Sequence, residues 1–484
     1  MLSINAFLLR TQQLDSVAIQ SNSAELTYSQ LQQKVFFAAQ TLKASRISEG
    51  ENVALLGNND LDYIVNVLAI WQLKAVPVLI NPRLTEHEIE EQLATAECNF
   101  VLIDKKISLK KLNLSIKVIS YPIKAKSKTA EENSEEGLNP EDTAVIIFTS
   151  GTSGKSKGVE LSFNNLLQSA KIGDQVIKHK QDDKWLASLS FSHIGGFSII
   201  TRSLLFGVTI IIPEDLHTES LSIAMMKFTP TICSLVPVQI KRMLESGVTP
   251  NEELRCVLLG GGYIDSGLVI NALTEGWNLV KVYGSTETAS FVTALTGDDI
   301  YEKPKSVGKA LKPNQVMIVN ETKLQIPWGE IGEIAVFSPA TLKGYYKNEE
   351  ETERKFEEEF YLTGDIGYLD ADSYLFVEAR RTDLIVTGGE NVNPNEVENR
   401  INEHPLVRES AVFPLKDDDW GEIVVAAIVM KENNNLNLEN LQEFLQADLA
   451  GFKIPKKIFI EKNLPINEQG KTLRSVLVER YEGV

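Results

Sequence analysis

The sequence predicts an α/β protein of more than one domain, built on parallel sheets. Between Asn52 and Tyr283, strand-like and helix-like segments alternate, as they do in βαβ units with parallel strands. From about Ser306 the pattern changes to short β elements between glycine turns, and a further unit starts near Arg380. A chain of 484 residues is long enough to form two or more domains with large cores.

The first third of the chain shows this alternation directly. Runs of β-branched and apolar residues predict strands, and apolar residues at helical spacing predict the helices between them. Thr85 followed by Glu88 is a capping pattern at the start of one helix. The strands are predicted at 52–56, 75–80 and 100–103, and the helices at 60–73 and 85–96. The polar tract 105–142 predicts a solvated loop.

The stretch Val145–Gly158 joins a buried-strand pattern to a loop suited to a polyphosphate. It reads V-I-I-F-T-S-G-T-S-G-K-S-K-G, and a short strand at 159–161 and a helix capped by Ser162 follow it. Glycines let backbone N–H groups approach phosphate oxygens, while hydroxyls add donors and lysine adds charge. The candidate ligands are Thr149, Ser150, Gly151, Thr152 and Lys157. The spacing does not fit the Walker P-loop, and a flexible surface turn is the alternative for this stretch by itself.

The alternation resumes after this loop, and the ends of its strands carry unusual residues. Strands are predicted at 184–189, 208–212, 231–236, 256–259 and 279–283, and a helix at 196–206. Gly260, Gly261 and Gly262 follow one strand and would let a backbone approach a flat ligand. Another strand ends in Tyr283-Gly284-Ser-Thr286-Glu287, which suits an adenine, a phosphate and Mg²⁺. By itself this pattern equally fits the capped start of a helix.

Further candidate residues stand singly. Asp365, which ends Y-L-T-G-D, can accept both hydroxyls of a ribose, and Arg380 can reach the same ribose or a phosphate. Lys471 follows a glycine and can bring a charge from a loop into a distant site. Taken singly, each has a simpler alternative. The T-G-D pattern is more often a turn, Arg380 would form a surface salt bridge, and Lys471 would be solvated. His193 lies in an apolar stretch, where a structural histidine is the simpler alternative.

The last third is predicted to be rich in β structure before a final unit of about 100 residues, which is large enough for its own core. The β elements are predicted at 316–319, 332–337, 365–369 and 373–378. In the final unit the strands are predicted at 384–387, 410–414 and 423–430, and the helices from 395 and at 438–449.

Composition narrows the class of partner. A net charge of −18 opposes non-specific binding to nucleic acid or to anionic membranes. The three cysteines are scattered and predict buried thiols in a reducing cytoplasm. No signal peptide is apparent, and the most apolar tract, Leu186–Pro213, is interrupted by charge and predicts no membrane span. A cytoplasmic protein that acts on small molecules is therefore expected, and a homo-oligomer remains possible.

Taken together, five motifs in this order resemble the acyl-adenylate-forming superfamily of acyl-CoA synthetases, luciferases and peptide-synthetase adenylation domains. They are T-S-G-T-S-G-K-S-K-G at 149–158, Y-G-S-T-E at 283–287, Y-L-T-G-D at 361–365, R-R-T-D at 380–383 and G-K at 470–471. The resemblance covers nearly the whole chain. It implies a large N-terminal domain, 1–379, with a β-rich subdomain. It also implies a small mobile α+β domain, 380–484, that rotates about a hinge at 380–383.

Within this superfamily the chain most resembles the o-succinylbenzoate–CoA ligases of menaquinone or phylloquinone synthesis. The resemblance rests on F-S-H-I-G-G-F-S at 191–198, on Arg202 nine residues after His193, and on the stretch 380–394. It implies that ATP, Mg²⁺ and coenzyme A convert the acid to its thioester through an acyl-adenylate. The sequence departs from this pattern at Gly195, where serine is usual, and at Phe291, where glutamine is frequent.

The resemblance also implies a role for each candidate residue. Lys471, His193 and Thr286 would be catalytic, and Glu287 would hold Mg²⁺. The acid would lie against His193, Gly195, Arg202 and Ser290. The nucleotide and coenzyme A would contact the phosphate loop with Lys157, the glycines 260–262, Tyr283, Gly284, Asp365, Arg380, Gly388 and Gly389. Another aryl- or acyl-CoA synthetase is the main alternative, and a nucleotide-binding protein without catalysis is a remote one.

Arg202 is predicted to bind the second carboxylate of the acid. Leu186–Pro213 offers no other permanent cation, and arginine matches the two oxygens of a carboxylate. A buried anion needs such a partner. The alternative is that Arg202 faces solvent or pairs with a structural acid.

Overall fold

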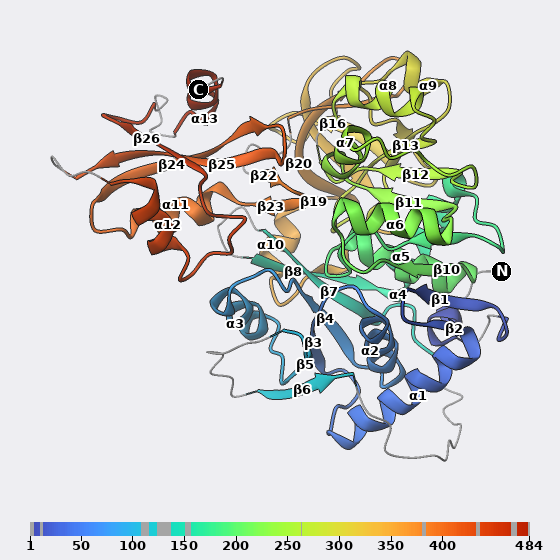
Figure 1. Cartoon of the computed structure of the whole chain (residues 1–484). Coiled ribbons are helices and arrows are strands. Elements are labelled where there is room, and N and C mark those ends of the chain that lie inside the picture. The colour runs from blue at the N-terminus through green and yellow to red at the C-terminus, as the bar shows by residue number, and fades with distance from the viewer. Residues whose placement is uncertain are drawn as a thin grey trace.

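The computed structural model describes residues 4–9, 13–107, 116–122, 137–150, 156–262, 264–379, 384–431, 436–465 and 472–482. Two sheets with helices between and around them make up most of the molecule (Figure 1). A β-rich part lies beside the larger sheet, and the C-terminal part forms a separate body at the upper left.

The larger sheet has nine strands, six of which run parallel in its centre. In spatial order they are β15 (Lys309–Ala310), β14 (Thr293–Leu295), β13 (Leu279–Tyr283), β12 (Cys256–Leu259), β11 (Ile232–Leu235), β9 (Lys184–Leu186), β10 (Thr209–Ile212), β1 (Val17–Ser21) and β2 (Glu25–Thr27). Strands β13 to β1 are parallel, and β14, β15 and β2 are antiparallel at the edges. The carboxyl ends of the central strands therefore lie along one edge, where α/β sheets bind ligands.

The second sheet has seven strands and carries the glycine-hydroxyl stretch. In spatial order they are β18 (Gly344–Tyr345), β8 (Ser156–Ser162), β7 (Thr143–Ser150), β4 (Val76–Ile80), β3 (Asn52–Leu56), β5 (Phe100–Asp104) and β6 (Lys117–Tyr121). Strand β6 lies in the tract 105–142, so the prediction of a continuous loop there was wrong. It is an edge strand with mostly exposed side chains, and it therefore lacks the apolar run that marks a buried strand.

Helices fill the space between the two sheets and cover their outer faces. α1 (Tyr28–Ala44), α2 (Leu61–Gln72), α4 (Phe163–Ile177) and α5 (Ile194–Phe206) share one core with both sheets, together with the 3₁₀ helix η1 (Ile4–Leu8). α3 (Glu86–Thr95) packs on the second sheet, and α6 (Thr218–Phe228), α7 (Pro237–Glu245) and α8 (Ser266–Thr274) pack on the larger one. The predicted caps are confirmed: Thr85 and Ser162 each accept from a backbone N–H three residues on. No helix of the described segments is long and apolar enough to cross a membrane.

The remaining elements form two smaller sheets. The β-rich part contains β16 (Gln315–Val319), β17 (Gly332–Phe337), β20 (Phe360–Leu369) and β19 (Phe356–Glu357), with β21 (Leu375–Ala379) paired to β20. The short helix α10 (Glu349–Arg354) leads from β18 of the second sheet to β19, whereas α9 (Asp299–Glu302) lies between β14 and β15 of the larger sheet. The C-terminal sheet contains β23 (Glu390–Val392), β22 (Ile385–Thr387), β25 (Gly421–Met430) and β24 (Val407–Asp417), with β26 (Lys457–Glu461) paired to β25.

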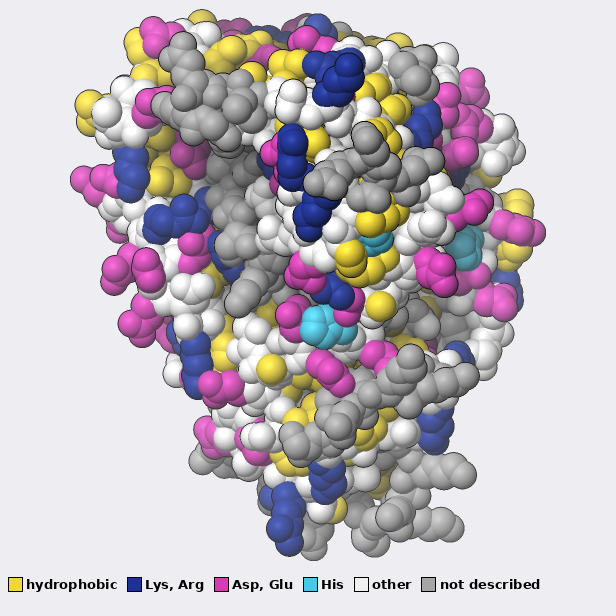
Figure 2. Space-filling view, turned by 90° about the vertical axis from the view of Figure 1, so that its left-hand side faces the viewer, with side chains coloured by type: hydrophobic (Ala, Val, Ile, Leu, Met, Phe, Trp, Pro, Cys, Tyr) yellow, Lys and Arg dark blue, Asp and Glu magenta, His cyan; other side chains and the backbone are white. Residues whose placement is uncertain are grey.

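Helices cover both faces of the C-terminal sheet. α11 (Pro394–Asn402) and α12 (Leu438–Leu445) pack on one face, and α13 (Arg474–Tyr481) packs on the other. The predicted fold class is confirmed: mixed sheets with helices, a β-rich part and a C-terminal α+β part. Acidic and basic side chains are interspersed over the visible face on the C-terminal side, without an extended region of one sign (Figure 2).

Candidate active site

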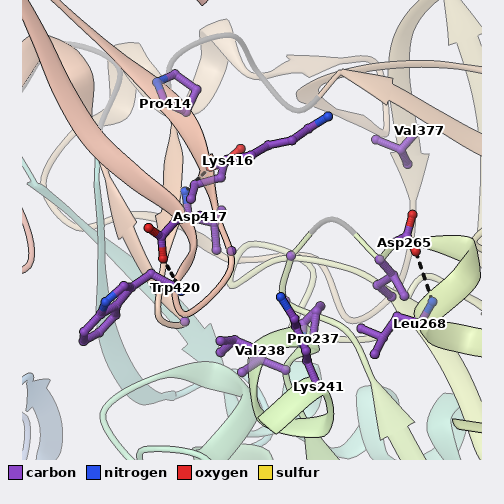
Figure 3. A pocket seen from close by; sticks show the side chains of 18 of the residues that line it. Pro237, Val238, Lys241, Asp265, Leu268, Val377, Pro414, Lys416, Asp417 and Trp420 are labelled. Atoms are coloured by element: carbon purple, nitrogen blue, oxygen red, sulfur yellow. Dashed lines mark hydrogen bonds between the residues drawn. The ribbon is translucent and has the colours of Figure 1, made fainter. Parts of the chain in front are cut away.

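A cavity of about 1190 Å³ lies between the larger sheet and the C-terminal part. Side chains from α7 and α8 face those of the β24–β25 hairpin across it (Figure 3). Its walls include Gly261, Gly262, Tyr283 and Gly284, which follow or end parallel strands as predicted, and Gly389 from the C-terminal part. The cavity thus lies at the edge of the sheet where a ligand was expected.

Of the residues predicted to bind adenine and ribose, Tyr283 lines this cavity and contacts Asp365 behind it. The Tyr283 hydroxyl at the end of β13 donates to Asp365 Oδ2 in β20 at 2.7 Å. At Gly284 an added Cβ would lie 2.1 Å from the carbonyl oxygen of Ser290, so only glycine fits there. Arg380, the other predicted ribose ligand, lies outside the described residues together with the predicted hinge at 380–383.

The predicted phosphate and metal ligands lie where β7, β8 and β13 end. Thr149 and Lys157 are direct partners across the antiparallel β7–β8 pair, so their side chains leave the same face of the sheet. Thr286 and Glu287 lie half-buried in a turn after β13, which excludes the alternative that they cap a helix. Gly151 and Thr152 lie outside the described residues, as does the side chain of Ser150.

Glu287 is the candidate magnesium ligand, and its surroundings fit that role. Its Oε1 accepts a hydrogen bond from the Tyr345 hydroxyl at 3.1 Å, and its carboxylate is half-buried. Among the described residues, no group of three or more His, Cys, Asp or Glu side chains is placed to hold a metal ion. A single carboxylate suits Mg²⁺ when phosphate oxygens and water complete its coordination.

Arg202 lies buried in α5 and has no acidic partner in the described part of the chain. Its Nη2 donates to Ser169 Oγ at 3.0 Å and to Ser290 Oγ at 3.1 Å, and its guanidinium lies 4.5 Å from the centre of the Phe291 ring. Only 3% of the residue is exposed. Burial lowers the pKa of Arg202 to about 9, so the group remains charged at neutral pH. The alternatives of a solvent-facing or acid-paired arginine are wrong for the described residues.

His193 begins α5 and contacts the C-terminal part, which sequence reasoning missed. Its Nε2 lies 3.1 Å from Glu390 Oε2, and Asn81 and Arg83 donate to the same carboxylate at 3.0 and 3.1 Å. Burial raises the pKa of Glu390, but the hydrogen bond and charge of His193 and the charge of Arg83 lower it overall to about 2. At the neighbouring Gly195 an added Cβ would lie 3.0 Å from Leu189, so a side chain there requires a small shift.

Gly388 and Gly389 form the tight turn that precedes Glu390. Both have positive φ, of 57° and 85°, which glycine adopts without strain. An added Cβ at Gly388 would lie 2.7 Å from Trp420, and one at Gly389 would lie 3.7 Å from Val236. This turn brings the C-terminal backbone to the cavity wall.

A charged contact whose residues do not line the cavity also joins the two parts. Lys453 of the C-terminal part lies 2.5 Å from Glu88 of α3 and 2.6 Å from Glu396 of α11. The side chains of Lys453 and Glu88 are only 9% and 6% exposed. We call these three residues the clamp, because they hold the C-terminal part against α3.

Comparison with known proteins gives full-length matches. The family described as AMP-binding enzyme matches residues 9–346, and AMP-binding enzyme C-terminal domain matches residues 396–471. The 2-succinylbenzoate–CoA ligase of Listeria monocytogenes is 36% identical over 94% of this chain and 95% of its own length. The o-succinylbenzoate CoA synthetase of Bacillus subtilis, a double mutant bound with the product analogue OSB-NCoA, has a TM-score of 0.92 at 30% identity, with 99% of each chain covered.

The same Bacillus subtilis protein superposes less well in other states. Its complex with the acyl-adenylate OSB-AMP has a TM-score of 0.75 at 30% identity, with 98% of this chain and 97% of that chain covered. Its complex with ATP and magnesium has a TM-score of 0.76 at 30% identity, with 97% and 98% covered. At the same sequence identity, this chain therefore superposes better on the product-analogue complex than on either of these two complexes. The matches along both parts show that the chain belongs to the AMP-binding enzyme family and carries that family's C-terminal domain.

Proposed function

We propose that this protein is an AMP-forming acid–CoA ligase that converts o-succinylbenzoate to o-succinylbenzoyl-CoA. The relatives named above support this reaction class along the full length of the chain. The substrate assignment rests on Arg202, a buried cation without an acidic partner in the described residues. In a substrate with two carboxylates, only one is activated and the other stays charged. That second anion can pair with the Arg202 guanidinium. We further propose a cytoplasmic location.

In the first half-reaction the substrate carboxylate attacks the α-phosphorus of ATP, and pyrophosphate leaves. The protein contributes by positioning and by neutralising charge. Tyr283 and Asp365 bind the adenosine, and Thr149 and Lys157 bind the outer phosphates. Glu287 would hold Mg²⁺, which supplies positive charge beside those phosphates when bound. Lys471, which lies outside the described residues, bridges the carboxylate and the α-phosphate.

In the second half-reaction the thiol of coenzyme A attacks the acyl-adenylate and AMP leaves. The cavity between α7, α8 and the β24–β25 hairpin is the channel for the pantetheine arm. Gly388 and Gly389 bring backbone close to that arm. Glu390 holds His193 in one orientation at the junction with the acid pocket.

We expect Glu390→Gln to slow thioester formation about tenfold and to leave adenylation unchanged. The substitution removes a charge that holds His193 and Arg83, and charged hydrogen bonds contribute about 1.5–3 kcal/mol. Thioester formation from supplied acyl-adenylate and pyrophosphate exchange measure the two steps separately. Glu439→Gln, at an exposed position on α12, is the control. Equal losses in both steps would show that Glu390 acts on the fold as a whole.

Pyrophosphate exchange with different acids tests the proposed function. The wild-type protein is expected to exchange label strongly with o-succinylbenzoate and weakly with benzoate, a fatty acid or an amino acid. Preference for a monocarboxylic acid would favour another acyl- or aryl-CoA synthetase. Absence of exchange with every acid, in a protein that still binds ATP, would favour a nucleotide-binding protein without catalysis.

A further inference from the structure

Lys157 already has a carboxylate partner in the structure. Its Nζ lies 2.6 Å from Glu351 Oε1 in α10, and the two side chains are 11% and 12% exposed. Glu351 also accepts two hydrogen bonds from Arg354, at 2.9 Å from Nε and 2.7 Å from Nη2. The ammonium group that the proposed function assigns to phosphates is therefore paired with a protein carboxylate.

The surroundings let the Lys157 ammonium change partners while the Lys157 backbone stays in place. Lys157 is fixed at its backbone by the β7–β8 ladder, opposite Thr149. Its Nζ lies 5.6 Å from the centre of the Tyr345 ring, whose hydroxyl donates to Glu287. The backbone N–H of Tyr345 donates to Thr352 Oγ1 at 2.9 Å. Adjacent residues of α10 thus contact the phosphate lysine and support the ring beside the metal carboxylate.

Electrostatics make the exchange reversible. A largely buried ammonium without an anion is costly, and Glu351 supplies that anion. Burial acts to raise the pKa of Glu351, but Lys157 and Arg354 lower it overall, so the group is ionised at neutral pH. When Lys157 turns away, Arg354 still pairs with the carboxylate. Glu351 is therefore not left as an unpaired charge.

We propose that Glu351 is the exchange counter-ion of Lys157. It holds the ammonium when no phosphate is present, releases it to the outer phosphates of ATP, and takes it back as pyrophosphate leaves. This inference rests on the proposed function. The pairing is seen in a structure that superposes with a TM-score of 0.92 on a relative bound to a product analogue, and pyrophosphate has left before such a product forms.

The test is Glu351→Gln, with Glu353→Gln on the same helix as the control. Glu353 is exposed, so its substitution makes the same charge change without touching Lys157. Without a competing carboxylate, the phosphates bind Lys157 more tightly. In Glu351→Gln we expect the KM for ATP and the inhibition constant of pyrophosphate each to fall roughly five- to tenfold, in the range of one ion-pair interaction. Thioester formation from supplied acyl-adenylate should be unchanged, and the control should match wild type.

The opposite result would overturn the proposal. If Glu351 only orients Lys157 or supports the fold, Glu351→Gln will raise the KM for ATP and weaken inhibition by pyrophosphate. Unchanged inhibition by pyrophosphate would equally refute it. Thermal melting of the variant identifies a folding defect, and Glu351→Asp, which retains the charge, should restore weak pyrophosphate binding. Failure of the proposed function is recognised separately, because wild type would then exchange pyrophosphate with a different acid or with none.

Discussion

Replacing Lys471 by alanine is expected to lower the rate of adenylation by about a hundredfold or more and to leave thioester formation from supplied acyl-adenylate intact. A lysine opposite the charge that develops on the α-phosphate contributes a few kcal/mol in such a site. Single-turnover measurement of each half-reaction separates the two effects. Lys457→Ala, at an exposed position on β26, is the control for loss of a lysine in the same part of the chain.

The arrangement of the C-terminal part explains why only one half-reaction should suffer. The described elements on either side of Lys471 are β26 and α13, and α13 packs on the face of the C-terminal sheet opposite α11 and α12. The α11 side meets α3 through the clamp, so α13 lies on the outside of the molecule (Figure 1). The proposed role of Lys471 in adenylation therefore requires a different arrangement of the two parts. Equal loss of both half-reactions in Lys471→Ala would contradict a role of Lys471 in adenylation alone.

Replacing Arg202 by glutamine is expected to weaken transition-state binding of o-succinylbenzoate by about 1.5–3 kcal/mol, the range for a charged hydrogen bond. The corresponding fall in kcat/KM is roughly ten- to 150-fold. A monocarboxylic analogue that lacks the second anion should be affected little. The ratio of the two kcat/KM values in wild type and variant is the measurement, and Arg255→Gln, which breaks an ion pair with Asp183 outside the acid pocket, controls for general destabilisation.

The same substitution should not lower the stability of the ligand-free protein. The pKa of Arg202 is lowered by burial, so folding disfavours its charged form at every pH below the folded pKa of about 9. A neutral glutamine removes that penalty and can still donate to Ser169 or Ser290. The melting temperature at pH 7 is expected to be equal or higher. A lower melting temperature with unchanged acid preference would show that Arg202 stabilises the fold and does not bind the second carboxylate.

Much of the fold could be predicted because its elements carry local signals. The strands β3, β12 and β13 have the predicted bounds, and α3 begins at its predicted capping pattern. Strand β6 was missed because an exposed edge strand has no apolar run. α1 was also not predicted, although Thr27 and Gln30 form a capping box and its buried residues follow helical spacing. In that case the signal was present in the sequence.

The candidate site was predictable only where its residues form contiguous motifs. Tyr283 and Glu287 belong to a short pattern at a strand end and the turn after it, and Asp365 belongs to a short pattern within β20, so their chemistry could be read locally. The partners of Glu390 could not, because Asn81 lies 309 residues away in sequence. Glu351 likewise meets Lys157 across 194 residues from a short helix rich in glutamate. Such pairs depend on how separate parts pack, which no local pattern records.

The clamp has a consequence for how easily the molecule can open. When Lys453 separates from Glu88, water hydrates both charges and offsets most of the attraction that is lost. The closed and open forms can therefore have similar free energies, although the closed one contains a short, buried contact. An apolar joint of similar extent would have no such compensation, because separating it would expose hydrocarbon to water. A charged joint thus suits the proposed rotation of the C-terminal part between the two half-reactions.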